Sequence, residues 1–212
     1  MRFRLEAQLA VLLWTGCGPS PPESTPRAPP DILVVALDTV RFDHTSLSGY
    51  ARDTTPNLAA LAALPGSVTF SRAYTDAAWS LPAYVSLFTG QHALSHGVGF
   101  RAVQLPPGQP TLASMLQAYG FATRAFVSGP HLAPDSGIGV GFDEYNHFPG
   151  ARTIGAQVDK VVEWMSEPAD TPRFAFVHGY DAHSPYPTPA VLSDLYNAHP
   201  RTEVEVCRSP TL

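Results

Sequence analysis

Three short stretches of this sequence carry side chains that could hold a cation, attack an ester or contact an anion. Asp38 lies in DILVVALDTVRFDH, Ser80 lies in AAWSLPAYVSLFTG, and FVHGYDAHSPY contains His178, Asp181 and His183. Carboxylates bind hard cations, a serine hydroxyl can act as a nucleophile, and imidazoles serve as acids, bases or anion contacts near neutral pH. Each of these residue types also has an ordinary structural role.

Asp38 and Ser80 each occupy a position that favours chemistry. Asp38 directly follows the apolar run Ile32–Leu37, where a carboxylate can bind a cation or can cap the next turn. Ser80 precedes Leu81–Thr89, a segment with helical character that Gly90 would end. The N-terminus of a helix favours sulfate or phosphate, and a hydroxyl there can become a nucleophile when a metal or base lowers its pKa. The alternative is that Ser80 only caps the helix.

The third stretch follows the apolar run Phe174–Val177. Its spacing could direct two imidazoles, His178 and His183, and the carboxylate of Asp181 into one cleft for acid–base work or anion contact. The alternative is a loop whose histidines make structural hydrogen bonds. The residues alone leave both interpretations open.

The elements that would position these residues alternate between strand and helix. The expected strands are Ile32–Leu37, Val68–Tyr74, Phe121–Val127 and Phe174–Val177, and the expected helices are Asn57–Leu64, Leu81–Thr89, Leu112–Tyr119 and Ile154–Met165. This alternation predicts an α/β fold with a mostly parallel sheet and helices on both faces. Ligands of such sheets bind at the carboxyl ends of the strands. That rule selects Asp38, the loop 77–82 and the loop 178–185.

Taken in order, these strings resemble the sulfatase family of the alkaline phosphatase superfamily. The resemblance runs over about Pro30 to Tyr186 and rests on PDILVVALDTVRFDH, GYARDTTPNLAALA, VTFSRAYTDAAWSLPAYVSLFTG, HGV, GFATRAFVSG, GFDEY and FVHGYDAHSPY. It implies an alkaline-phosphatase-like fold. It also implies metal-assisted hydrolysis of small sulfuric or phosphoric esters by a hydroxyl nucleophile.

The resemblance also assigns roles to individual residues. Asp38 would be the first metal ligand and Ser80 the counterpart of the nucleophile. His183 would contact the transferred group or its leaving oxygen, and Asp181 and His178 would join it in binding substrate. The implied cofactor is a divalent cation: an oxygen-rich site favours Ca²⁺ or Mg²⁺, with Ca²⁺ expected first, while additional histidine ligands favour Zn²⁺ or Mn²⁺.

Departures from the family pattern modify these expectations. Sulfatases carry C-x-P-x-R or S-x-P-x-R, whose first residue is oxidised to formylglycine, whereas Tyr84 stands at the arginine position here. We therefore expect an unmodified Ser80. Thr39 replaces a second acidic residue, and no D-H-G or D-N-G string follows Tyr186. These features predict a C-terminally truncated chain that lacks part of its metal site. The alternative is a non-catalytic envelope lipoprotein or a decayed fragment of a phosphodiesterase or phosphotransferase relative.

The N-terminus has the pattern of an export signal. A basic start precedes the brief apolar run Ala7–Trp14, which is too short to span a membrane, and Thr15-Gly16-Cys17 resembles a bacterial lipobox whose cysteine is acylated. The alternatives are plain secretion, an unprocessed anchor or a wrongly assigned start. The predicted organisation is a signal peptide at 1–17, a Pro-rich linker at 18–30, a sulfatase-like domain at 31–200 and an irregular tail at 201–212. The expected location is the bacterial cell envelope or periplasm, on a lipid anchor.

Composition narrows the class of protein. The chain has 212 residues, of which 44% are hydrophobic and 15% charged, as in a globular domain. Its net charge of -5 and the lack of a basic stripe argue against nucleic acid as a partner. Its two cysteines, Cys17 and Cys207, provide no disulfide framework if Cys17 is acylated.

Overall fold

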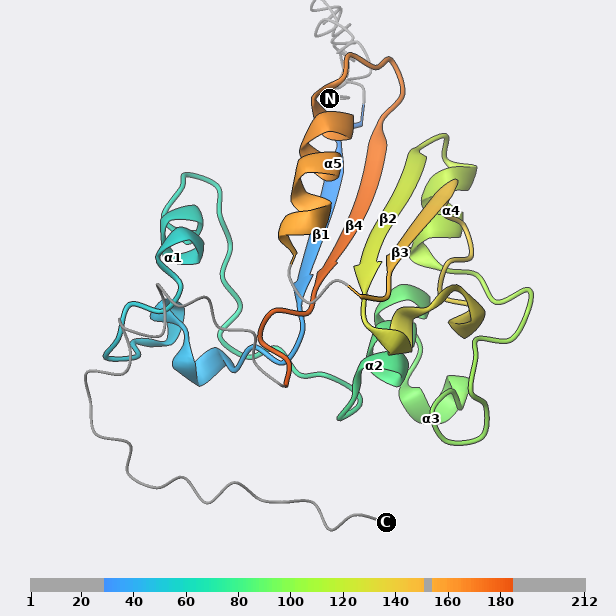
Figure 1. The fold of residues 1–212 in the computed structure, drawn as a ribbon, viewed down its shortest axis with the longest axis horizontal. Coiled ribbons are helices and arrows are strands. Elements are labelled where there is room, and N and C mark those ends of the chain that lie inside the picture. Colours follow the sequence, from blue (N-terminus) through green and yellow to red (C-terminus); the bar gives the residue numbers. More distant parts are fainter. Residues whose placement is uncertain (1–28, 151–153, 185–212) are drawn as a thin grey trace, which may run out of the picture.

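The computed structural model describes residues 29–150 and 154–184. Its centre is a sheet of four strands, β1 (Ile32–Leu37), β2 (Ala122–Ser128), β3 (Glu144–Phe148) and β4 (Arg173–Gly179). The strands lie in the order β1-β4-β2-β3, and every neighbouring pair is parallel (Figure 1). This confirms the predicted α/β fold with a parallel sheet.

Burial along the strands follows from this order. All seven residues of β4 are buried, because β4 lies between β1 and β2 and is covered on both faces. The edge strand β1 instead alternates between half-buried and exposed residues. Since Leu37 pairs with Gly179, β1 and β4 end side by side, and the residues that follow them are brought together.

Helices cover both faces of the sheet, as predicted. The helices are α1 (Pro56–Ala62), α2 (Ser80–Thr89), α3 (Ala93–His96), α4 (Leu112–Ala118) and α5 (Gly155–Ser166). α2 and α4 pack against one face and α5 packs against the other. Local signals set the helix ends: Gly90 ends α2 in the left-handed conformation, and Thr111 and Ser114 form a capping box at the start of α4.

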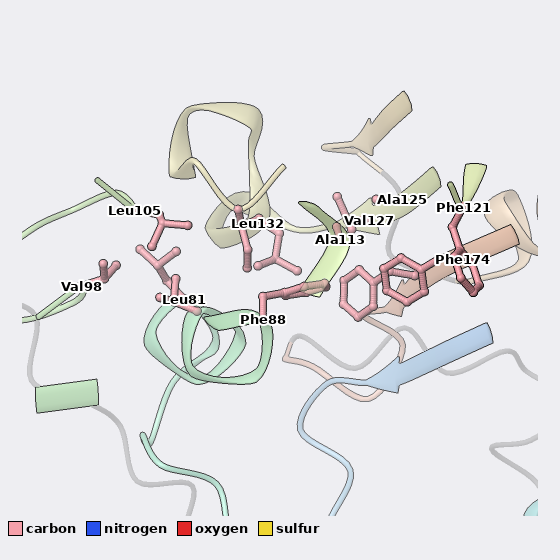
Figure 2. Close-up of a cluster of buried hydrophobic side chains, with 13 residues drawn as sticks. Leu81, Phe88, Val98, Leu105, Ala113, Phe121, Ala125, Val127, Leu132 and Phe174 are labelled. Carbon is pink, nitrogen blue, oxygen red and sulfur yellow. The ribbon is translucent and has the colours of Figure 1, made fainter. Parts of the chain in front are cut away.

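Two apolar cores hold the helices to the sheet. The larger lies between α2, α4 and the sheet, and Figure 2 shows part of it. Within it Phe88 meets Phe176 edge to face at 4.9 Å between ring centroids, and Phe142 stacks on Phe174 at 5.6 Å. The smaller core lies between α5 and the sheet and consists of Phe126, Val161, Trp164, Ala175 and Val177.

One expected strand does not form, and one observed strand was not expected. Val68–Tyr74 was expected to be a strand but is irregular, and Val68 and Phe70 are each 74% exposed. Strand propensity is realised only where a neighbouring strand supplies hydrogen bonds, and within the described residues none pairs with this segment. Conversely, β3 was not expected, because EYNHF at the opposite edge of the sheet is too polar to produce an apolar run.

The apolar residues of α5 divide between core and surface. Val158, Val161, Val162 and Met165 were expected on one face of this helix. Val161 and Met165 pack in the smaller core together with Trp164, whereas Val158 and Val162 are 39% and 57% exposed.

No helix within residues 29–150 and 154–184 is long and apolar enough to cross a membrane. The predicted signal peptide, Cys17, most of the linker and the predicted tail lie outside the described residues.

Candidate active site

Asp38 lies where the chain leaves β1. Its backbone N–H donates to the carbonyl oxygen of Gly179 at 3.0 Å, which continues the pairing with β4 by one residue. The next residue, Thr39, has φ 59°, a left-handed conformation that a β-branched residue rarely adopts. Such outliers cluster at functional sites. The side chain of Asp38 is 10% exposed, so a nearly buried carboxylate is held at the carboxyl end of the sheet.

Ser80 is the first residue of α2 and faces this carboxylate. Its Oγ donates a hydrogen bond to Asp38 Oδ2 at 2.8 Å, joining residues 42 positions apart. The preceding residue, Trp79, is extended and provides no side-chain cap. The hydroxyl therefore sits at the positive end of the helix dipole, beside a carboxylate that can accept its proton.

His178 supports Asp38 from β4. Its side chain is 1% exposed, with Nε2 3.1 Å from Asp38 Oδ2 and Nδ1 3.0 Å from the carbonyl oxygen of Ser128. Both ring nitrogens face oxygen atoms, so the ring is held from two sides. Gln157 of α5, also fully buried, donates to the hydroxyl of the same Ser128. A continuous polar chain thus links α5 to Ser80.

The surroundings of Asp38 favour its ionised form. Burial alone would raise its pKa, but hydrogen bonds from His178 and Ser80, together with the charges of His178 and His183, hold the pKa of Asp38 below its ordinary value. The carboxylate is therefore charged at neutral pH and accepts the hydrogen bond from Ser80.

His183 lies in the cleft beside Ser80. Its ring stacks on Tyr180 with centroids 4.1 Å apart, and its Nδ1 donates to the carbonyl oxygen of Ser184 at 2.8 Å. Asp181 points elsewhere and accepts the backbone N–H of Ile154 at 2.8 Å, at the start of α5. The structure therefore brings together Asp38, Ser80 and His183.

The predicted substrate contacts of Asp181 and His178 remain predictions, and the geometry favours supporting roles for both. His178 is buried beneath Asp38, with both nitrogens already engaged. Asp181 fixes the segment that leads into α5 through its hydrogen bond with the backbone N–H of Ile154.

The cleft has a volume of about 770 Å³ and includes residues that sequence reasoning did not assign. Trp79 and His131 line it, and their rings meet edge to face with centroids 5.2 Å apart. Proximity to Ser80 in the chain could have identified Trp79. The family resemblance places His131 near positions that contact sulfate, but the pattern is out of register by one residue there, so His131 was not assigned a role.

Tyr84 stands one helical turn after Ser80, at the position of the missing arginine. Its ring packs edge-on against His178 with centroids 5.0 Å apart, and against Phe176 at 5.9 Å. Burial raises the pKa of the Tyr84 hydroxyl well above its ordinary value, so the side chain stays neutral. Tyr84 thus provides an uncharged wall for the His178 ring where the family pattern has a cation.

A second Ser–His–Asp group lies beside the cleft, but its hydrogen bonds run in different directions from those of a catalytic triad. The N–H of Val98 donates to His96 Nδ1 at 3.0 Å, so the proton of the neutral ring lies on Nε2, which faces Ser86 Oγ at 3.0 Å. Ser86 in turn donates to Asp76 at 3.0 Å, and Asp76 also pairs with His92 at 2.7 Å. His96 therefore cannot act as base toward Ser86, and the network instead anchors the loop that leads to Ser80.

The described residues do not by themselves form a cation site. No group of three or more His, Cys, Asp or Glu side chains in the described ranges could hold a metal ion. Asp38 is a single carboxylate, and one of its oxygens already accepts two hydrogen bonds. A cation bound there would need ligands beyond those present in this part of the chain.

Comparison with known proteins identifies the relationship. The family model described as Sulfatase matches residues 30–203. No curated protein matches the chain. Similar solved structures include a phosphonate monoester hydrolase of Agrobacterium radiobacter, with a TM-score of 0.64 and 23% identity over 76% of this chain. Another is the C-terminal periplasmic domain of EcEptC from Escherichia coli in complex with Zn, with a TM-score of 0.62 and 18% identity over 87% of this chain.

A third similar structure is a protein solved in complex with its substrate D-glucosamine-2-N,6-O-disulfate, with a TM-score of 0.62 and 20% identity over 73% of this chain. At these identities the likeness establishes the fold. The chain spans 35%, 43% and 52% of the lengths of the disulfate-bound protein, the hydrolase and the EcEptC domain, respectively.

Proposed function

The chain belongs to the sulfatase family, and from this premise we propose that its site cleaves small sulfuric or phosphoric esters with the unmodified hydroxyl of Ser80 as nucleophile. The observation that carries the proposal is the hydrogen bond from Ser80 Oγ to Asp38 Oδ2 at the N-terminus of α2. In this arrangement the proposed nucleophile and its proposed proton acceptor are in contact at the end of a helix that favours anions.

In the proposed first step, Ser80 Oγ attacks the sulfur or phosphorus atom while its proton passes to Asp38. A bond forms from Oγ to that atom, and the bond to the ester oxygen breaks with its electron pair. The partial positive charge at the start of α2 stabilises the negative charge on the transferred group. Water then attacks the sulfur or phosphorus atom and gives a proton to His183, while the bond to Ser80 Oγ breaks and Oγ recovers its proton from Asp38.

His183 is the proposed partner of the departing oxygen. It lines the same cleft as Ser80, and its stacking on Tyr180 and its bond to Ser184 fix the ring. Because Nδ1 already donates to Ser184, only the protonated ring has an Nε2–H left, and in that form His183 can donate this proton to the oxygen as charge develops on it. His178 acts indirectly, by holding Asp38 in place.

A divalent cation remains part of the proposal, with Asp38 as one ligand. The solved structure of the EcEptC domain contains Zn, while an oxygen-rich site would favour Ca²⁺ or Mg²⁺. No catalytic step is assigned to the ion, because the described residues do not complete its coordination.

Sulfate and phosphate esters are both retained as substrate classes. The similar structures include a phosphonate monoester hydrolase and a protein bound to a sulfated sugar, and neither relationship exceeds 25% identity. A serine without the formylglycine modification would suit phosphoryl transfer, in which a hydroxyl attacks directly.

Turnover of ester substrates by the purified full chain tests the proposal. We expect hydrolysis of an aryl sulfate, a phosphodiester or a phosphonate ester, assayed with Ca²⁺, Mg²⁺, Mn²⁺ and Zn²⁺ in turn. Ser80→Ala should lower the rate by about 10³-fold or more, since it removes the attacking atom. Ser95→Ala, which changes an exposed serine of α3, should not alter it. Absence of turnover with every ester and ion would refute the proposed activity.

We also propose that the protein resides in the bacterial cell envelope on an acylated Cys17. The lipobox-like string supports this, and one similar structure is described as a periplasmic domain. Cys17→Ser should move the protein from the membrane fraction to the soluble fraction of expressing cells. An unchanged distribution would refute the anchor.

A further inference from the structure

A second cleft adjoins the one that contains Ser80. It has a volume of about 490 Å³ and shares two lining residues with the first cleft, Trp79 and His131. Trp79 is also the residue directly before Ser80. A molecule whose reacting group lies at Ser80 can therefore extend past these two rings into the second cleft.

The Trp79 ring is held firmly between these clefts. A methyl group added at Gly99 would lie 2.8 Å from an indole carbon of Trp79, so the backbone of Gly99 packs directly against the ring. The edge of His131 contacts the indole from another side. Trp79 nevertheless remains 41% exposed, so part of the residue stays accessible from the clefts.

The lining of the second cleft combines apolar and polar groups. Phe100, 61% exposed, adds a second aromatic ring to that of Trp79. Arg101, Gln104 and Asp135 place hydrogen-bonding groups of both charge signs around these rings. Arg101 is held by a bond from its guanidinium to the carbonyl oxygen of Leu94 at 2.8 Å. Aromatic faces with polar groups around them bind flat rings that carry polar substituents.

We propose that the second cleft is a subsite for the organic part of the ester, and that Trp79 selects esters in which this part is a ring with an apolar face. The proposal rests on the proposed function of Ser80 and adds its substrate class. An aryl group and a pyranose both present such a face. Esters of small alkyl alcohols would leave the indole uncovered and gain nothing from it.

Binding of ring-bearing alcohols tests the subsite without requiring turnover. The probes are phenol and a methyl pyranoside, with ethanol as the comparison, and the readout is the indole N–H resonances of the full chain, assigned with Trp79→Phe. Phenol, the pyranoside or both should shift the Trp79 resonance saturably, and the one that binds identifies the ring. The Trp164 resonance should not move, since this residue of α5 is buried between the helix and the sheet. No saturable shift at Trp79 with either ring would overturn the subsite.

Variants separate the role of Trp79 from a general loss of structure. Trp79→Ala should weaken ring binding roughly three- to tenfold, the range expected for one aromatic contact. Gly99→Ala should weaken it through displacement of the indole, while Val68→Ala, at an exposed valine outside both clefts, should not. Thermal unfolding of each variant checks that the fold is kept. Equal ring affinity in Trp79→Ala and the unaltered chain would contradict the proposal.

Kinetics distinguish failure of the subsite from failure of the proposed function. If phenyl and ethyl esters are both hydrolysed, Trp79→Ala should lower kcat/KM for the phenyl ester and leave that for the ethyl ester unchanged. An unchanged ratio would overturn the subsite while the function stands. Ring binding without any ester turnover would overturn the function while the subsite stands.

Discussion

The polar chain from Gln157 through Ser128 and His178 to Asp38 gives a physical reason for the position of Ser80. Each link is a hydrogen bond between buried or nearly buried groups, so removing one member leaves another without its partner. Asp38 alone would have been a plausible turn-capping residue. The contacts of His178 and Ser80 give it a defined role as a charged acceptor.

Removing His178 should therefore destabilise the protein. His178→Ala removes one of the two hydrogen bonds to the Asp38 carboxylate and the contact with the Ser128 carbonyl, and it opens a cavity next to Tyr84. We expect a loss of about 2–4 kcal/mol in the free energy of unfolding, measured by chemical denaturation. The exposed His44 provides the control, and His44→Ala should change stability by less than about 0.5 kcal/mol. A loss at His178 no larger than at His44 would contradict the buried network.

Sequence reasoning could find Asp38, Ser80 and His183 because each follows a recognisable strand or begins a recognisable helix. It could not find Gln157 or Ser128, whose side chains look like ordinary members of a helix and a strand. Their role depends on the packing of α5 against β2, which no local pattern encodes. His131 lies near a position of the family pattern but one residue out of register, and its contact with Trp79 at the cleft could not be read from the sequence.

At the scale of elements, Asp143 ties β2, β3 and α4 together. Its carboxylate accepts the backbone N–H of Thr123 at 2.8 Å, in β2, and the side-chain amide of Gln117 at 2.7 Å, in α4. The hydrogen bond from the Thr123 backbone, then that from Gln117, hold the pKa of Asp143 below its ordinary value. The carboxylate's contribution to stability is thus fully present above its ordinary pKa of 3.8 and is lost as pH falls through the lower folded value.

Asp143→Asn should show this pH dependence. At pH 7 the variant should lose about 0.5–1 kcal/mol of unfolding free energy, at the lower end of the usual range because the side chain is exposed to solvent. The difference from the unaltered chain should shrink as pH falls below about 4. Chemical denaturation at several pH values measures both, with the exposed Asp159→Asn as the control. A difference that does not depend on pH would contradict this role for the carboxylate.

The elements themselves were largely predictable. Apolar runs bounded by Asp or Gly identified β1, β2 and β4, and cap residues identified α2 and α4. Prediction failed where tertiary context decides: Val68–Tyr74 has strand propensity without a described partner, and β3 pairs despite a polar sequence. Neither outcome could be read from periodicity.

At the scale of the whole molecule, the apolar side chains on one face of β1 are exposed. Leu33, Val35 and Leu37 are 50%, 53% and 40% exposed on the face that α5 covers over β4. β1 is also an edge of the described sheet, and an exposed apolar edge is prone to pair with other chains.

Charge placed on this edge should reduce self-association. Val35→Lys puts an ammonium group on the open face of β1, which opposes pairing between copies, and it should lower the self-associated fraction in sedimentation velocity. Val103→Lys adds the same charge at an exposed valine far from β1 in sequence and serves as the control. Equal effects of both substitutions would mean that net charge, rather than the β1 face, governs association.

The central claim is that an unmodified Ser80 attacks the ester, and the most direct test is the mass of the tryptic peptide 73–101. This peptide also contains Ser86 and Ser95, so fragmentation distinguishes Ser80 from two internal controls. Before substrate is added, the mass should be that of intact serine. In samples quenched during turnover, one sulfuryl or phosphoryl group should appear on Ser80 and be absent from Ser80→Ala. Formylglycine at position 80, or a transferred group on another residue, would contradict the account.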